Sequence, residues 1–135
     1  MDENCIFCKL ANHVFETNII YEDDDFTVIL DAGPATKGHA LILPKEHHAN
    51  LYEMPDELLS KAAVLAKKVV TALTEKLHPQ GYNIVQNNGE TAGQTVFHFH
   101  IHLIPRYSDD GQAIGWKPKK PSDTELKELA EQIRL

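Results

Sequence analysis

The segment that most constrains this chain is residues 93–106, which read Gly-Gln-Thr-Val-Phe-His-Phe-His-Ile-His-Leu-Ile-Pro-Arg. Within it, His98, His100 and His102 alternate with apolar residues. Side chains on a β-strand point to opposite faces with a period of two, so we expect the three imidazoles to share one face. The other face is expected to pack against a core and carries Phe97, Phe99, Ile101 and Leu103. A solvated strand face has no structural need for three histidines, so the pattern predicts a functional site.

The composition indicates a single globular domain. The chain has 135 residues, and no apolar run approaches the ~20 residues of a membrane span, so we expect one domain over residues 1–135 and no membrane partner. The net charge of -7 argues against a broad nucleic-acid surface, although a single nucleotide can still bind in a local site. The acidic N-terminus lacks the apolar region of a signal peptide, so we expect a cytoplasmic protein.

Hydrophobic periodicity predicts an α+β fold. Besides the histidine segment, strand-like runs cover residues 19–21, 26–30, 38–43 and 82–86. A long helix with one broad apolar face is expected from about Pro55 to Leu77, ending at His78-Pro79. Short helices are expected at residues 5–10 and from Ser122, which has the capping-box spacing to Glu125. This order predicts a mainly antiparallel sheet of about five strands, with one long helix and short terminal helices.

The only two cysteines, Cys5 and Cys8, form a Cys-x-x-Cys pair. A disulfide is not expected in a reducing compartment, which leaves a redox motif, a metal site or coincidence. A thioredoxin-like motif lies between a strand and a helix, and nothing strand-like precedes Cys5. Together with the eight histidines of the chain, the pair favours metal binding.

Three chemistries are compatible with the row of histidines. They are a metal centre, general acid–base catalysis, and covalent catalysis in which a neutral imidazole attacks phosphorus. The preceding loop contains Asn88, Gln94 and Thr95, whose amides and hydroxyl suit the oxygens of a phosphate. Arg106 follows, whereas a hydrolytic metal site usually has Asp or Glu nearby. The surroundings therefore favour phosphoryl or nucleotidyl transfer over a metallohydrolase.

The segment resembles the signature of the histidine triad family, His-φ-His-φ-His-φ-φ with φ hydrophobic, which here is His98-Phe-His100-Phe-His102-Leu-Ile. Similar blocks occur along nearly the whole chain: Cys5-Ile-Phe-Cys8-Lys, Leu30-Asp31, Gly38-His-Ala-Leu-Ile-Leu-Pro44-Lys-Glu-His47, Asn87-Asn88-Gly89 and Ala92-Gly93-Gln94. The chain is most similar to the zinc-carrying bacterial branch, close to the purine-nucleoside phosphoramidases. The resemblance implies the histidine triad fold.

The resemblance also implies a mechanism. The middle histidine, His100, would attack the α-phosphorus of a purine nucleotide and form a nucleotidyl-histidine intermediate, from which water releases a nucleoside monophosphate. His102 would contact the phosphate and help to protonate the leaving group. By the same resemblance, the phosphate would be bound by Asn88, Gln94, Thr95 and His102. The nucleoside would be bound by Ile6, Phe7, Leu30 and Asp31, with the Asp31 carboxylate on the ribose hydroxyls.

A structural zinc ion is implied as well, with the ligands Cys5, Cys8, His47 and His98. Two thiolates and two imidazoles form a closed tetrahedral set that leaves no position for water. The adjacent His48 is an alternative ligand, although the motif spacing favours His47. Two other histidines, His13 and His39, match no role in the family pattern and are expected to be ordinary surface or core residues. Family members are usually homodimers joined through the long helix and a sheet edge.

Two alternative functions remain open. Dinucleoside polyphosphate hydrolases of the family also carry three histidines, and the Leu-Ile-Pro-Arg sequence suits them, but the cysteine pair favours the phosphoramidase branch. A non-catalytic nucleotide-binding or interaction module would keep the pocket without turnover, and the intact His100 and His102 argue against this. The branch that moves nucleotides between sugar phosphates has Gln as its third triad residue, so His102 favours hydrolysis.

Overall fold

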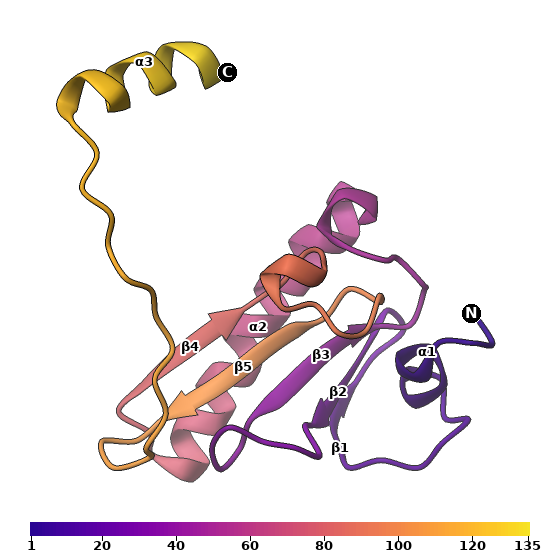
Figure 1. Cartoon of the computed structure of the whole chain (residues 1–135). Helices are drawn as coiled ribbons and strands as arrows, with labels where there is room; N and C mark the ends of the chain where they lie inside the picture. Colours follow the sequence, from indigo (N-terminus) through magenta and orange to yellow (C-terminus); the bar gives the residue numbers. More distant parts are fainter.

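The computed structural model describes all 135 residues and contains one five-stranded antiparallel sheet (Figure 1). The strands are β1 (Ile19–Glu22), β2 (Phe26–Leu30), β3 (Ala40–Pro44), β4 (Gly81–Val85) and β5 (Ile101–Arg106). Their order across the sheet is β1-β2-β3-β5-β4, so the last strand in the sequence lies between β3 and β4. The α+β class and the antiparallel sheet are therefore confirmed.

The long helix α2 (Asp56–Leu77) covers one face of the sheet (Figure 1). Its first turn carries Asp56 and Glu57, whose charges complement the positive end of the helix dipole. It ends at His78, which adopts a left-handed conformation with φ 53° and whose N–H bonds to the Thr74 carbonyl. These boundaries agree with the predicted helix to within one residue. No helix of the protein combines the length and the apolar character that crossing a membrane requires.

The two faces of the sheet have different cores because side chains alternate along each strand. On β3, Ala40 and Ile42 belong to the larger cluster, which also contains the buried face of α2. The residues that alternate with them, Leu41 and Leu43, belong to a smaller cluster under α1 (Ile6–Ala11). Burial of each Ile or Leu side chain among these residues contributes ~1.5–3 kcal/mol. The α1 face of the sheet is the one that holds the histidines.

The predicted histidine strand is shorter in the structure than expected. The strand β5 begins only at Ile101, and residues 96–98 form a bend. The Phe99 N–H bonds to the His48 carbonyl at 2.7 Å, outside the sheet, so the ladder cannot extend further towards the N-terminus. Phe99 lies in the core as predicted, but Phe97 is 54% exposed, and the expectation that it packs inward was wrong.

The segment after β5 leads away from the sheet. Residues 113–122 form an extended strap without regular structure, and α3 (Asp123–Ile133) stands apart from the other elements (Figure 1). The Ser122 hydroxyl accepts the Glu125 N–H at 3.1 Å, as the capping-box spacing predicts. The apolar stripe of α3 is exposed and consists of Leu126, Leu129, Ala130 and Ile133. Two single turns of 3₁₀-helix, η1 (Leu51–Glu53) and η2 (Glu90–Ala92), complete the fold.

Candidate functional site

Two thiols and two imidazoles meet beside α1. Cys5 caps this helix and Cys8 follows three residues later, so the two side chains lie on the same side of its first turn. The Cys8 Sγ atom lies 3.3 Å from His47 Nδ1 and 3.4 Å from His98 Nδ1, and Cys5 Sγ lies 3.4 Å from the same His98 atom. All four atoms lie within 4.8 Å of one another. The structure thus brings together the four residues for which the sequence predicts a metal site.

The orientation of His98 fits metal ligation. Its Nε2 atom lies 2.9 Å from the Pro44 carbonyl oxygen, which can only accept, so Nε2 carries the hydrogen and Nδ1 presents a lone pair to the thiols. Burial lowers the pKa of His98 to about 4, so the ring is neutral near pH 7. Burial also raises the pKa of the Cys8 thiol. The alternative residue His48 points elsewhere and lies 3.0 Å from Glu46 Oε1.

His100 is held with one nitrogen free. Its Nδ1 atom donates to the His98 carbonyl at 2.7 Å, so the lone pair is on Nε2. The ring packs against the edge of Phe7, with ring centroids 4.8 Å apart. Burial lowers the pKa of His100, so the imidazole is neutral near pH 7. The Nε2 atom of His100 has no hydrogen-bond partner. Because every fully buried side-chain nitrogen in the structure has one, this atom is accessible from solvent.

His39 contacts the triad directly. It lies between Gly38, whose φ of +90° turns the chain towards the sheet, and Ala40, the first residue of β3. Its side chain is buried, with its Nε2 atom 2.9 Å from His102 Nδ1 and 3.5 Å from Asp31 Oδ2. The expectation that His39 is an ordinary residue without a site role was therefore incomplete. The register of β3 against β5, in which Leu41 pairs with His102, places the two rings on the same face.

Hydrogen bonds also determine which nitrogen of each ring carries the hydrogen. The Ala35 N–H donates to His39 Nδ1 at 2.9 Å, so the neutral His39 ring has its hydrogen on Nε2 and donates it to His102 Nδ1. The hydrogen of His102 is therefore on Nε2. Burial, together with the neighbouring His100 and His39, lowers the pKa of His102 to about 4. His102 is thus a neutral donor beside the free nitrogen of His100.

Among the three predicted phosphate-binding loop residues, Thr95 has the most freedom. It is exposed, and its hydroxyl makes no hydrogen bond within the protein. The Gln94 side chain instead donates to the carbonyls of Ala49 and Val96 and accepts the Gly89 N–H. The Asn88 amide exchanges hydrogen bonds with Gln86 and accepts the Leu51 N–H. These two amides stabilise the loop, and of the three side chains only that of Thr95 has no partner within the protein.

The predicted nucleoside residues occupy different environments. Phe7 contacts His100, whereas Ile6 and Leu30 are 43% and 37% exposed. The Asp31 Oδ1 atom accepts the Gly33 N–H at 2.8 Å, and Oδ2 faces His39. The carboxylate therefore caps the turn after β2 and also faces the triad.

Comparison with known proteins agrees with this arrangement. The family model of the HIT domain matches residues 12–109. The adenosine 5'-monophosphoramidase hnt1 of Schizosaccharomyces pombe is 39% identical over 131 residues, which cover 96% of each chain. The crystal structure of a HIT family protein from Bacillus anthracis is similar with a TM-score of 0.89 and 38% identity, covering 98% of this chain and 96% of that one.

A further solved structure is informative about metal binding. It is a Zn-bound histidine triad family protein from Mycobacterium smegmatis, similar with a TM-score of 0.78 and 38% identity over 86% of this chain and 84% of that one. These similarities extend over most of the chain and include the segments that carry His39, His47 and the three alternating histidines. The chain therefore belongs to the histidine triad (HIT) family.

Proposed function

We propose that this protein is a nucleotide hydrolase that acts at the α-phosphorus of a purine nucleoside phosphoramidate or a related nucleotide, through a covalent nucleotidyl-His100 intermediate. The observation that carries the proposal is the pair of free nitrogens: His100 offers a lone pair on Nε2, and the neighbouring His102 offers an N–H. The S. pombe relative named as an adenosine 5'-monophosphoramidase supports this choice of substrate class.

The first step forms the intermediate. The His100 Nε2 lone pair attacks the α-phosphorus, the phosphorus–nitrogen bond breaks, and its electron pair remains on the leaving nitrogen. That nitrogen takes one proton from solvent and leaves as an amine, with the His102 Nε2–H donating a hydrogen bond to it. A positive charge develops on His100 in this step. The His98 carbonyl stabilises it, because it accepts the hydrogen bond from His100 Nδ1.

The second step regenerates the enzyme. Water attacks phosphorus, the bond to His100 Nε2 breaks and its electron pair returns to the imidazole, and one proton of the water goes back to solvent. The products are a nucleoside monophosphate and free His100. The Thr95 hydroxyl donates to the phosphoryl oxygens in both steps, while Asn88 and Gln94 hold the loop in place. Phe7, Ile6 and Leu30 form the apolar contact with the base, and Asp31 accepts the ribose hydroxyls.

We also propose that Cys5, Cys8, His47 and His98 bind one zinc ion. Two thiols and two imidazoles are a donor set that tetrahedral zinc prefers, and the Zn-bound M. smegmatis relative supports the choice of metal. Because the four protein ligands fill the coordination sphere, the metal would be structural and would stabilise the fold around α1. Reduced thiols are needed for such a site, which supports a cytoplasmic location.

A homodimer is the assembly that we propose. The edge strand β4 has a free side in this chain, and Ile84 on it is 56% exposed. Pairing of two such edges would cover the unpaired backbone N–H and C=O groups of β4 and the Ile84 side chain. Sedimentation equilibrium of the purified protein should give twice the mass of one chain, and a monomer at micromolar concentration would contradict the proposal.

The proposed function is tested by measuring turnover of adenosine phosphoramidates, dinucleoside polyphosphates and the p-nitrophenyl ester of adenosine monophosphate. We expect the phosphoramidates to be hydrolysed, and His100→Ala to lose more than about 99% of this rate while still binding adenosine monophosphate. His13→Ala, which removes an exposed histidine, is the matched control. A His100→Ala variant that retains activity would exclude covalent catalysis by this residue. Preference for dinucleoside polyphosphates would favour the alternative hydrolase, and no turnover at all would favour a binding module.

A further inference from the structure

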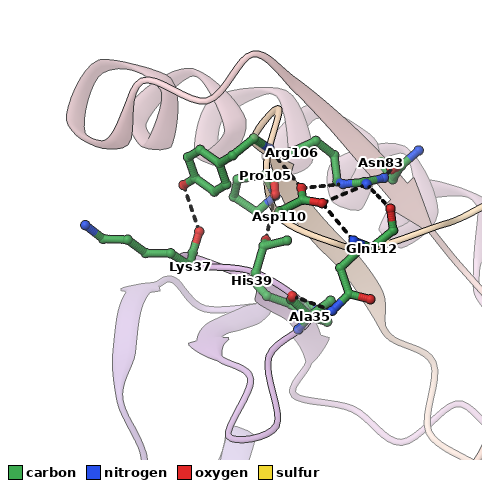
Figure 2. A network of polar contacts seen from close by, with 10 residues as sticks. Ala35, Lys37, His39, Asn83, Pro105, Arg106, Asp110 and Gln112 are labelled. Carbon is green, nitrogen blue, oxygen red and sulfur yellow. Dashed lines mark hydrogen bonds and ion pairs between the residues drawn. The ribbon is translucent and has the colours of Figure 1, made fainter.

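A compact turn follows β5 and is built around one carboxylate (Figure 2). Asp110 accepts two hydrogen bonds from the Arg106 guanidinium, at 2.9 and 3.1 Å. It also accepts the backbone N–H groups of Tyr107, at 2.9 Å, and Gln112, at 3.0 Å. The Asp110 side chain is only 8% exposed. Four donors on one carboxylate fix the path of residues 107–112, because a charge-assisted, bidentate pair with Arg is geometrically specific.

This turn is bound to the segment between β2 and β3. The Gln112 side chain donates to the Ala35 carbonyl at 2.8 Å, and the Tyr107 hydroxyl donates to the Lys37 carbonyl at 2.8 Å (Figure 2). From the other side, the Thr36 hydroxyl donates to the Pro105 carbonyl at 2.6 Å. Three consecutive residues of this segment, 35–37, are thus each bonded to the chain around the Asp110 turn.

The same segment controls the histidines. The carbonyl of Ala35 accepts a hydrogen bond from Gln112. The N–H of the same residue donates to His39 Nδ1 and so fixes the hydrogen of His39 on Nε2. His39 in turn donates to His102 at 2.9 Å. If Ala35 moved away, His39 could carry its hydrogen on Nδ1. His39 Nε2 would then accept instead of donate, and the hydrogen of His102 would no longer be fixed on Nε2. The contacts therefore continue from Asp110 to the third triad histidine.

We propose that Asp110 and Gln112 are positioning residues for the leaving-group side of the reaction. They hold residues 35–37 in the place where the Ala35 N–H selects the His39 tautomer, and so keep the Nε2–H of His102 directed at the leaving atom. Neither residue touches the substrate. This inference rests on the proposed function of His102.

The proposal predicts that the loss of kcat in variants of these residues depends on the leaving group. An alkylamine needs a hydrogen-bond donor as it leaves, whereas p-nitrophenolate is stable without one. Gln112→Ala and Asp110→Ala should lower kcat for an adenosine alkylphosphoramidate by about tenfold or more, with KM changed less than about twofold. For the p-nitrophenyl ester, kcat should fall less than about threefold. Asp109→Ala removes a neighbouring exposed carboxylate that makes no hydrogen bond, and should behave as wild type.

Equal losses for the two substrates, or no loss in either variant, would overturn the proposal. Gln112 is exposed, so its variant remains informative if Asp110→Ala does not fold. A second measurement does not depend on turnover: ¹⁵N NMR of the imidazoles should show the Nε2–H tautomer of His39 and His102 in the wild type and a mixture of tautomers in Gln112→Ala. Unchanged tautomers in that variant would refute the positioning role even if the protein hydrolysed no nucleotide, whereas changed tautomers without any turnover would place the failure in the proposed function.

Discussion

The Nε2 atom of His39 lies 2.9 Å from the Nδ1 atom of His102, and this contact joins the residue just before β3 to the last histidine of the triad. It is a bond between two neutral rings, because burial lowers the pKa of both. In a neutral pair only one of these two nitrogens carries a hydrogen. It is the His39 nitrogen, because the Ala35 N–H donates to the other nitrogen of that ring. The backbone of Ala35 therefore sets the direction of the hydrogen bond from His39 to His102.

We expect His39→Ala to reduce kcat for phosphoramidates by about ten- to a hundredfold, since His102 would lose the partner that orients it. KM should change less than kcat, because His39 is buried and the Asp31 carboxylate beside it keeps its hydrogen bond from the Gly33 N–H. Steady-state kinetics of the variant and of His13→Ala would test this. Activity equal to that of wild type would show that His102 is oriented without His39.

One zinc ion per chain is expected in protein purified without a chelator. Cys8→Ala should lose the metal and lower the melting temperature by more than about 5 °C, because metal binding contributes folding free energy. His48→Ala should keep the metal, since this ring faces Glu46 instead of the cysteines. Elemental analysis and thermal unfolding measure the two effects. Full zinc content in Cys8→Ala would contradict the assignment of the ligands.

For Asp31, we expect 2′-deoxyadenosine monophosphate to bind at least about tenfold more weakly than adenosine monophosphate. Asp31→Ala should remove this difference, because the carboxylate that accepts the ribose hydroxyls is lost. The variant should also unfold at a lower temperature, since Asp31 caps the turn at Gly33. Calorimetric titration gives the affinity ratio. Equal binding of the two nucleotides to the wild type would leave only the capping role.

The Asp110 turn predicts a dependence of stability on acid pH. The Arg106 guanidinium, with the backbone N–H groups of Gln112 and Tyr107, holds the pKa of the Asp110 carboxyl well below its usual range. A lowered pKa in the folded state stabilises the protein above the unfolded pKa of about 3.9 and loses this effect as the pH falls towards the folded pKa. The melting temperature of Asp110→Ala should thus approach that of wild type as the pH is lowered from about 5 to about 2. A constant difference would mean that the charge of Asp110 is not responsible.

The elements with strong periodicity could be predicted from the sequence. The helix α2 follows from one apolar face bounded by Pro55 and His78, and the strand β3 follows from an uninterrupted apolar run ending at Pro44. Such patterns are local, so the chain itself contains the information. The cluster of Cys5, Cys8, His47 and His98 required the family resemblance in addition, because residues this far apart in sequence have no local signal for contact.

What could not be predicted depends on register and on competition for hydrogen bonds. His39 reaches His102 only because Leu41 pairs with that residue across β3 and β5, and a strand pattern does not specify its partner's register. The Gln94 side chain has three protein partners, and a sequence shows an amide without showing what it binds. Phe97 is exposed because the chain bends at residues 96–98, where the sequence pattern is still that of a strand.

The unequal surroundings of the two chain ends matter for any attached tag or fusion. The backbone N–H of Asp2 lies 3.4 Å from Cys8 Sγ, and its carboxylate lies 3.9 Å from His47, so an N-terminal addition begins next to the four metal-site residues. At the other end, the residues with proposed roles stop at Gln112, and the strap and α3 separate them from Leu135. An affinity handle or surface tether at the C-terminus is therefore the design that disturbs this chemistry least.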